Sequence, residues 1–114
     1  MAFQTATSIL GAATNYKIAP TAKRYTLRDN GFTETPNGNY QLIRPLEATP
    51  QSKEGLKLKI TVDQEIKKLK MSVTTANGLK AVNIFKNNNE LLIEKFNFLM
   101  AGFIDRGLFE KVDK

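Results

Sequence analysis

Apolar and polar residues alternate strictly over two neighbouring stretches of the chain, separated by a turn near Asp63 to Ile66. The apolar positions of this alternation are Leu56, Leu58, Ile60, Val62, Leu69, Met71 and Val73. A period of two is typical of a β-strand that buries one face. Asn77-Gly78 then favours a hairpin turn that returns the chain, with Val82 beside Val73 and Ile84 beside Met71. This pattern predicts an antiparallel meander over residues 56–86.

An earlier region, residues 23–46, also has an extended pattern, interrupted by two Asn-Gly pairs. A three-residue loop at residues 29–31 and a two-residue loop at Asn37-Gly38 give one consistent register. In that register the residues expected to face the core are Tyr25, Leu27, Thr33, Thr35, Tyr40 and Leu42. The opposite face then collects Thr26, Arg28, Phe32, Glu34, Gln41 and Ile43. A one-residue change in either loop would mix the two faces.

The hydrophobic period changes to a helical one from Asn87 onward, where Asn87 and Glu90 fit a capping box. The apolar stripe consists of Leu92, Phe96, Leu99 and Phe103, widened by Ile93, Met100 and Ile104, with Leu91 and Phe98 on another flank. This spacing predicts a helix over residues 88–106 that is buried on more than half of its circumference. Arg106 and Gly107 suit its C-terminal end.

These elements predict a single α+β domain over residues 1–114. Its two antiparallel β-sheets, formed by the two meanders, are expected to pack against a single long C-terminal helix. Residues 47–55, which include Pro50, have a linker-like composition and are expected to join the two meanders. The stretches Phe3 to Leu10 and Tyr16 to Ile18 are expected to add strands at an edge.

The composition restricts the chemistry more than it restricts the fold. The chain has 114 residues, 17 Lys and Arg against 11 Asp and Glu, a formal net charge of +6, no His and no Cys. It therefore lacks an imidazole base, a thiolate nucleophile and the ligands of a zinc finger. No catalytic residue, metal site or cofactor is predicted, and no glycine-rich phosphate motif is present. Enzymatic activity is left open, and a non-enzymatic role is favoured.

The N-terminal residues and the hydropathy of the chain favour a cytoplasmic protein. Residues 1–10 lack the basic start of a signal peptide and are interrupted by polar side chains. No apolar run approaches the roughly 20 residues that a membrane span requires. The sequence gives no indication of the oligomeric state.

Four lysines are expected on one outward face of the second meander. With the apolar positions in the core, the pleat directs Lys57, Lys59, Lys68 and Lys70 to the same side. Like charges on neighbouring strands repel mildly, so this patch is either compensated by nearby acids or attracts an anion. It is a candidate anion-binding site. One alternative is RNA binding, although Phe85 is the only aromatic residue expected nearby, and another is an ordinary solvated face.

A second candidate cluster lies in the first meander. It consists of Arg24, Arg28, Arg44 and Glu34, and the predicted register places Arg28 close to Phe32 and Ile43. Guanidinium groups bind carboxylates through two parallel hydrogen bonds, so this cluster suits a ligand carboxylate. Structural ion pairing is the alternative interpretation.

Two runs resemble a small uncharacterised family of lactic-acid and related Gram-positive bacteria, described as proteins of amino-acid metabolism. The first is KRYTLRDNGFTETPNGNYQLIRPLE, from Lys23 to Glu47. The second combines LKITV, from Leu58 to Val62, with TTANGLKAVNIFK, from Thr74 to Lys86. The resemblance implies a cytoplasmic α+β protein with two sheets packed on one helix. It also implies a remote architectural similarity to S-adenosylmethionine decarboxylases. Their self-processing Glu-Ser bond is absent here, since the serines follow Thr7, Gln51 and Met71, so that activity is not expected.

The sequence therefore favours an accessory protein of bacterial amino-acid metabolism, including sulfur amino acids, that binds a small anionic metabolite or a protein partner. Nucleic-acid binding through the lysine face is the first alternative. A small enzyme that relies on carboxylates such as Asp29 and Glu34 is the second.

Overall fold

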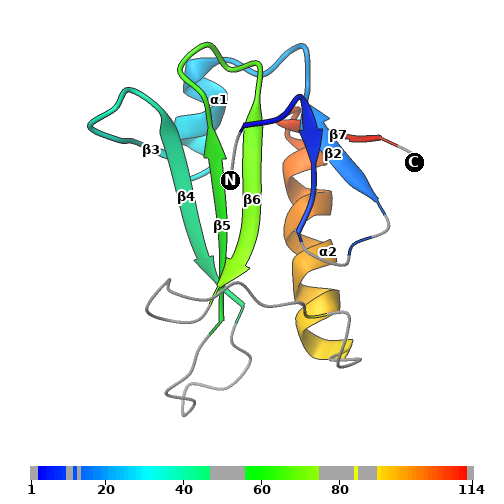
Figure 1. The fold of residues 1–114 in the computed structure, drawn as a ribbon. Coiled ribbons are helices and arrows are strands. Elements are labelled where there is room, and N and C mark those ends of the chain that lie inside the picture. The colour runs from blue at the N-terminus through cyan, green and yellow to red at the C-terminus, as the bar shows by residue number, and fades with distance from the viewer. Residues whose placement is uncertain are drawn as a thin grey trace.

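Two antiparallel sheets and one main helix form the computed structural model of the protein (Figure 1), which confirms the predicted α+β class. The structure describes residues 3–9, Ala12, residues 14–46, residues 56–74, Ile84 and residues 90–112. In Figure 1 the four-stranded sheet stands on the left, and the main helix runs beside it with the three-stranded sheet near its C-terminal half. The predicted linker at 47–55 and the Asn87 cap lie outside the described residues. So does the strand expected to return after Asn77-Gly78, apart from Ile84, which is buried.

The larger sheet has the order β3-β4-β5-β6, with β3 at Thr33–Glu34, β4 at Tyr40–Pro45, β5 at Lys57–Val62 and β6 at Leu69–Thr74. The period-two alternation is confirmed at its apolar positions, because Leu58, Ile60, Val62, Leu69, Met71 and Val73 are buried. Thr61, on the opposite face, is buried as well. Leu42 pairs with Ile60, so β4 and β5 are neighbours and the strands of both predicted meanders form one continuous sheet. The prediction of two sheets is therefore confirmed, but the assignment of one sheet to each meander is wrong. That junction buries a shared apolar face.

The Asn37-Gly38 hairpin is confirmed, but its loop is one residue longer than predicted. Thr35 N donates to Asn39 O at 2.7 Å, and Gly38 has φ of 86°. This is the geometry of a turn followed by a left-handed glycine, and Pro36 suits the first central position of that turn. The extra residue shifts the register, so that Glu34 pairs with Tyr40, and Thr33 lies on the outward face with Gln41.

Residues Arg24–Asp29 form a short helix, α1, where the sequence pattern predicts a strand. Its start is held by the Thr26 hydroxyl, which accepts a hydrogen bond from Lys23 N at 3.1 Å. Gly31, at φ of 95°, follows its end. Asn-Gly favours positive φ both in a hairpin and after a helix, so the dipeptide alone does not distinguish the two.

The helical turn of α1 changes which side chains reach the core. Leu27 is fully buried as predicted, but Tyr25 is 66% exposed, and Thr26 and Phe32 are buried instead. The predicted core face of the first meander is therefore correct for Leu27, Tyr40 and Leu42 and wrong for Tyr25 and Thr33.

The smaller sheet has the order β1-β2-β7, with β1 at Ala6–Thr7, β2 at Asn15–Ile18 and β7 at Phe109–Val112. The two N-terminal strands occupy the stretches expected to add strands at an edge, and β7 is an element that the sequence pattern does not predict. Gln4 and Leu69 also form an antiparallel bridge, with N–O distances of 2.8 and 2.9 Å. The N-terminal segment thus connects the two sheets.

The main helix, α2, spans Glu90–Asp105, and Gly107, whose φ is 77°, lies in the turn that follows it. Its buried residues are Leu92, Phe96, Met100 and Phe103, as the helical stripe predicts. Phe103 packs edge-to-face on Phe32 and Phe109, with ring centroids 6.4 and 5.7 Å apart. Leu91 and Phe98 are 64% and 75% exposed, so the expected burial of that flank is wrong. No helix within the described ranges has the length and apolar character needed to cross a bilayer.

Candidate functional site

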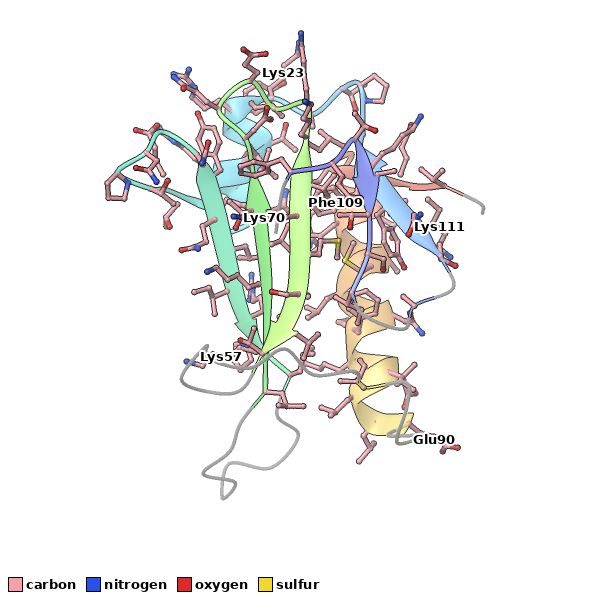
Figure 2. All side chains as sticks on the ribbon, in the orientation of Figure 1. Lys23, Lys57, Lys70, Glu90, Phe109 and Lys111 are labelled. Atoms are coloured by element: carbon pink, nitrogen blue, oxygen red, sulfur yellow. The ribbon has the colours of Figure 1, made fainter. Side chains whose placement is uncertain are left out.

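The structure places three of the four predicted lysines on one face of the larger sheet and the fourth in a turn. The β5–β6 register places Lys57, Lys59 and Lys70 on the outward face of the larger sheet, since they pair with Thr74, Ser72 and Thr61. In Figure 2, Lys57 lies at the lower end of this sheet and Lys70 nearer its upper end. Lys68 instead belongs to the β5–β6 turn, where its carbonyl accepts a hydrogen bond from Asp63 N.

The predicted arginine cluster is also dispersed. Arg24 and Arg28 are exposed one turn apart on α1, so the predicted position of Arg28 on a strand near Ile43 is wrong. Arg44 pairs with Leu58 in the sheet and lies against Gly31, where an added Cβ would be 3.3 Å from its Nη2. Among the described residues, none of these arginines forms an ion pair with Glu34. Arg24 lines a large hollow.

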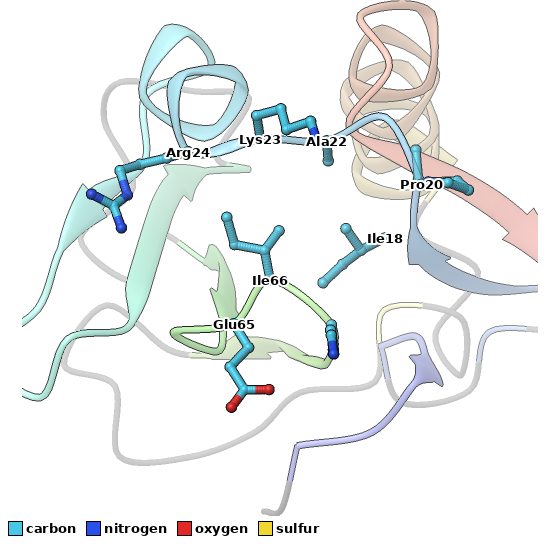
Figure 3. Close-up of a pocket in the computed structure, with 9 residues that line it drawn as sticks. Ile18, Pro20, Ala22, Lys23, Arg24, Glu65 and Ile66 are labelled. Atoms are coloured by element: carbon cyan, nitrogen blue, oxygen red, sulfur yellow. The ribbon is translucent and has the colours of Figure 1, made fainter.

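That hollow, here called the α1 hollow, lies between the segment leading from β2 into α1 and the turn between β5 and β6. Its volume is about 580 Å³, and its lining residues are Ile18, Ala19, Pro20, Ala22, Lys23, Arg24, Glu65, Ile66 and Lys67. Figure 3 shows Ile18 and Ile66 in the middle of the hollow, with Arg24 and Glu65 toward its rim. An apolar centre with a few charged groups around it is the usual composition of a small-molecule site.

The turn that supplies one wall of the α1 hollow contains a strained residue. Ile66 has φ of 59°, and it is the one residue other than glycine with positive φ in the described part of the chain. A β-branched side chain disfavours this left-handed conformation, which costs on the order of 1–3 kcal/mol. Asp63 holds the turn in place, because its Oδ1 accepts hydrogen bonds from Lys67 N at 2.7 Å and Lys68 N at 3.0 Å.

The rim of the α1 hollow carries three cations and one carboxylate. Lys23 and Arg24 come from the start of α1, and Glu65 and Lys67 flank Ile66. No ion pair links these four side chains within the described ranges. Their charges are therefore available to a ligand that carries a carboxylate and an ammonium group.

A hollow of similar volume, about 570 Å³, lies between α2 and the β2–β7 strands, with Tyr16, Asp105 and Lys111 in its lining. Its charged groups interact within the chain, since Lys17 Nζ lies 3.5 Å from Glu110 Oε1. Burial raises the pKa of the Tyr16 phenol above its usual value. Two of its four charged lining residues, Lys17 and Glu110, pair with each other, so this second hollow has fewer unpaired charges for an ionic ligand than the α1 hollow.

The α1 hollow combines residues that sequence reasoning separates. Glu65 and Lys67 belong to the predicted turn, whereas Arg24 belongs to the predicted arginine cluster. Nothing in the spacing of residues 18–24 and 65–67 indicates that they meet. The one available hint of the hollow is that Ile18 and Ile66 are apolar residues outside the regular apolar patterns, each beside a lysine.

Comparison with known proteins gives one family and one solved structure. The model of the DUF1831 family, described as "Putative amino acid metabolism", matches residues 1–110. The crystal structure of a DUF1831 family protein from Lactobacillus plantarum is similar to this chain, with 34% sequence identity and a TM-score of 0.86. The similarity covers 98% of this chain and 99% of that one. No curated protein matches the chain significantly.

Proposed function

Because the chain belongs to the DUF1831 family, whose description is amino-acid metabolism, we propose that it is a cytoplasmic accessory protein that binds a small zwitterionic metabolite in the α1 hollow. The ligand class is an amino acid or a close derivative, and the role is binding rather than catalysis. The observation that carries this proposal is the strained Ile66 in the wall of a charged hollow. Strain of this kind persists where the surrounding structure holds it and is concentrated at ligand sites.

The charges on the rim support a zwitterion rather than a simple anion. The Arg24 guanidinium and the Lys67 ammonium suit the carboxylate of a ligand, and the Glu65 carboxylate suits its ammonium group. Ile18, Ala22 and Ile66 offer an apolar surface to its side chain. The volume of about 580 Å³ is within the range of small-molecule sites.

The test is a titration of the ¹⁵N-labelled chain with each standard amino acid, including cysteine and methionine, followed by NMR. We expect chemical-shift changes at residues 18–24 and 65–67 for at least one amino acid. Arg24→Gln should weaken that binding about tenfold, because a charge-assisted contact to the carboxylate is lost. Arg28→Gln is the matched control, since it removes the same charge from α1 one turn away and outside the hollow.

Glu65→Gln separates a zwitterionic ligand from a simple carboxylate. It should weaken the binding of the amino acid and leave unchanged the binding of the corresponding 2-oxo acid, which lacks the ammonium group. Equal losses of affinity in Arg24→Gln and Arg28→Gln would contradict the proposal. So would the absence of chemical-shift changes at residues 18–24 and 65–67 with every amino acid. Binding of a protein partner would then be the function to examine.

A further inference from the structure

A small hollow on the outward face of the larger sheet is lined by two lysines and two hydroxyl residues. We propose that this hollow binds the phosphate group of a small phosphorylated metabolite. Its volume is about 170 Å³, and its lining residues are Lys59, Thr61, Lys70, Met71 and Ser72. None of them lines the α1 hollow, so this site is independent of the function proposed above.

The strand register brings the four polar side chains around one space. Lys59 pairs with Ser72, and Thr61 pairs with Lys70, so that each ammonium group lies opposite a hydroxyl. Side chains directly opposite in antiparallel strands have Cβ atoms roughly 5 Å apart, and diagonal neighbours remain within reach of long side chains. Donors from four different residues therefore surround the same hollow.

Thr61 indicates that this space suits an oxygen-rich ligand. The residue lines the hollow although it is only 5% exposed. A hydroxyl both donates and accepts hydrogen bonds, so the Thr61 side chain suits a ligand oxygen in the hollow.

Lys70 is positioned by an aromatic ring from another segment. Its Nζ lies 5.0 Å from the centroid of the Phe3 ring. The Gln4–Leu69 bridge fixes the N-terminal segment alongside β6 and so places Phe3 next to Lys70. Restricting the side chain in this way lowers the entropy lost when its ammonium group binds an anion.

The charge of this face favours a phosphate over a carboxylate. The register assigns ten described residues to it, and none is acidic: Thr33, Gln41, Ile43, Pro45, Lys57, Lys59, Thr61, Lys70, Ser72 and Thr74. None of them is an arginine, whose planar fork matches a carboxylate. Lysines act as point charges, and together with separate hydroxyl donors they suit a dianion with several oxygens.

The experiment titrates the ¹⁵N-labelled full chain with inorganic phosphate, O-phosphoserine and an oligouridylate. We expect saturable shifts at Lys59, Thr61, Lys70 and Ser72 with the first two probes. Thr61→Val, which keeps the shape of the side chain, should weaken O-phosphoserine binding about tenfold. Lys59→Gln should weaken it about fivefold. Lys57→Gln is the matched control, because it removes the same charge from the same strand and face outside the hollow.

Several results would overturn the phosphate site. Equal losses in Lys57→Gln and Lys59→Gln would mean a diffuse attraction to the sheet rather than a site. Oligouridylate binding that exceeds O-phosphoserine binding and falls steeply with salt would assign the face to nucleic acid instead. If Thr61→Val lowers the melting temperature strongly, the comparison of the two lysine variants still decides the question.

Discussion

Asn30 and Arg106 join the C-terminal ends of α1 and α2 through their side chains. Arg106 Nε donates a hydrogen bond to Asn30 Oδ1, and Asn30 Nδ2 donates to Thr26 O at 2.7 Å. Asn30 is 5% exposed, and the guanidinium carbon of Arg106 lies 5.5 Å from the centroid of the Phe103 ring. One buried amide group therefore connects the short helix beside the α1 hollow to the main helix.

Replacing that amide should destabilise the protein. We expect Asn30→Ala to lower the free energy of unfolding by about 1–3 kcal/mol, because Thr26 O and Arg106 both lose a partner. Urea denaturation measures this change. Arg28→Ala, an exposed position on the same helix, should change it by less than about 0.5 kcal/mol. Equal effects of the two substitutions would show that the connection contributes nothing.

The β5–β6 turn depends on the side chain of Asp63. Asp63→Ala removes the acceptor of two backbone N–H groups and should destabilise the protein by about 1–2 kcal/mol. Asp63→Asn retains an acceptor oxygen and should lose less than half as much. Hydrogen exchange is the direct measurement, since the amides of Lys67 and Lys68 should exchange faster in Asp63→Ala. Unchanged protection of these amides would contradict the role of Asp63.

Truncating two phenylalanines on α2 should change the stability of the protein by very different amounts. Phe103 is 1% exposed and packs on two other rings, so Phe103→Ala should cost about 3–5 kcal/mol. Phe98 is 75% exposed, and Phe98→Ala should change stability by less than about 0.5 kcal/mol. Thermal and urea unfolding of both variants compare the two positions on one helix. A large loss in Phe98→Ala would mean that this residue is covered in solution.

Stability at alkaline pH should depend on Tyr16. Burial raises the pKa of its phenol in the folded state above the value of 10.0 expected for the unfolded chain. Between these two pKa values the unfolded state releases a proton that the folded state retains, so stability falls as pH rises above about 10. The measurement is the free energy of unfolding of the wild-type chain minus that of Tyr16→Phe, at pH 8 and at pH 11. This difference should be smaller at pH 11 than at pH 8. The same difference at both pH values would contradict the raised pKa of Tyr16.

The period-two and helical patterns predicted β5, β6 and α2 well, because each of these elements buries one complete face against the core. Leu58 and Phe96, for example, occupy regularly spaced positions, and both are buried because those positions face the core. Residues 24–29 lack such a pattern, and their helical form depends on contacts with distant residues. Arg106, which caps this region through Asn30, is far away in the sequence and carries no local signal.

The candidate site was predicted less well than the fold. The outward direction of Lys57, Lys59 and Lys70 follows from alternation alone, so the sequence pattern placed three of the four predicted lysines on the correct face. The α1 hollow was not, because it forms where a segment before α1 meets a turn between two strands. Its strained residue, Ile66, is also invisible in a sequence, since isoleucine is normally a strand former.

Because β2 pairs with β7, which is far away in the sequence, the smaller sheet is completed late in synthesis. Asn15 is made early, whereas its partner Val112 leaves the ribosome only after α2 has been translated. The strands of the larger sheet follow one another in the sequence, so that sheet can form on the nascent chain. Until β7 arrives, β2 presents one unpaired edge to its surroundings. Another chain can pair with such an edge, so we expect a risk of aggregation at β2 that ends when β7 is released.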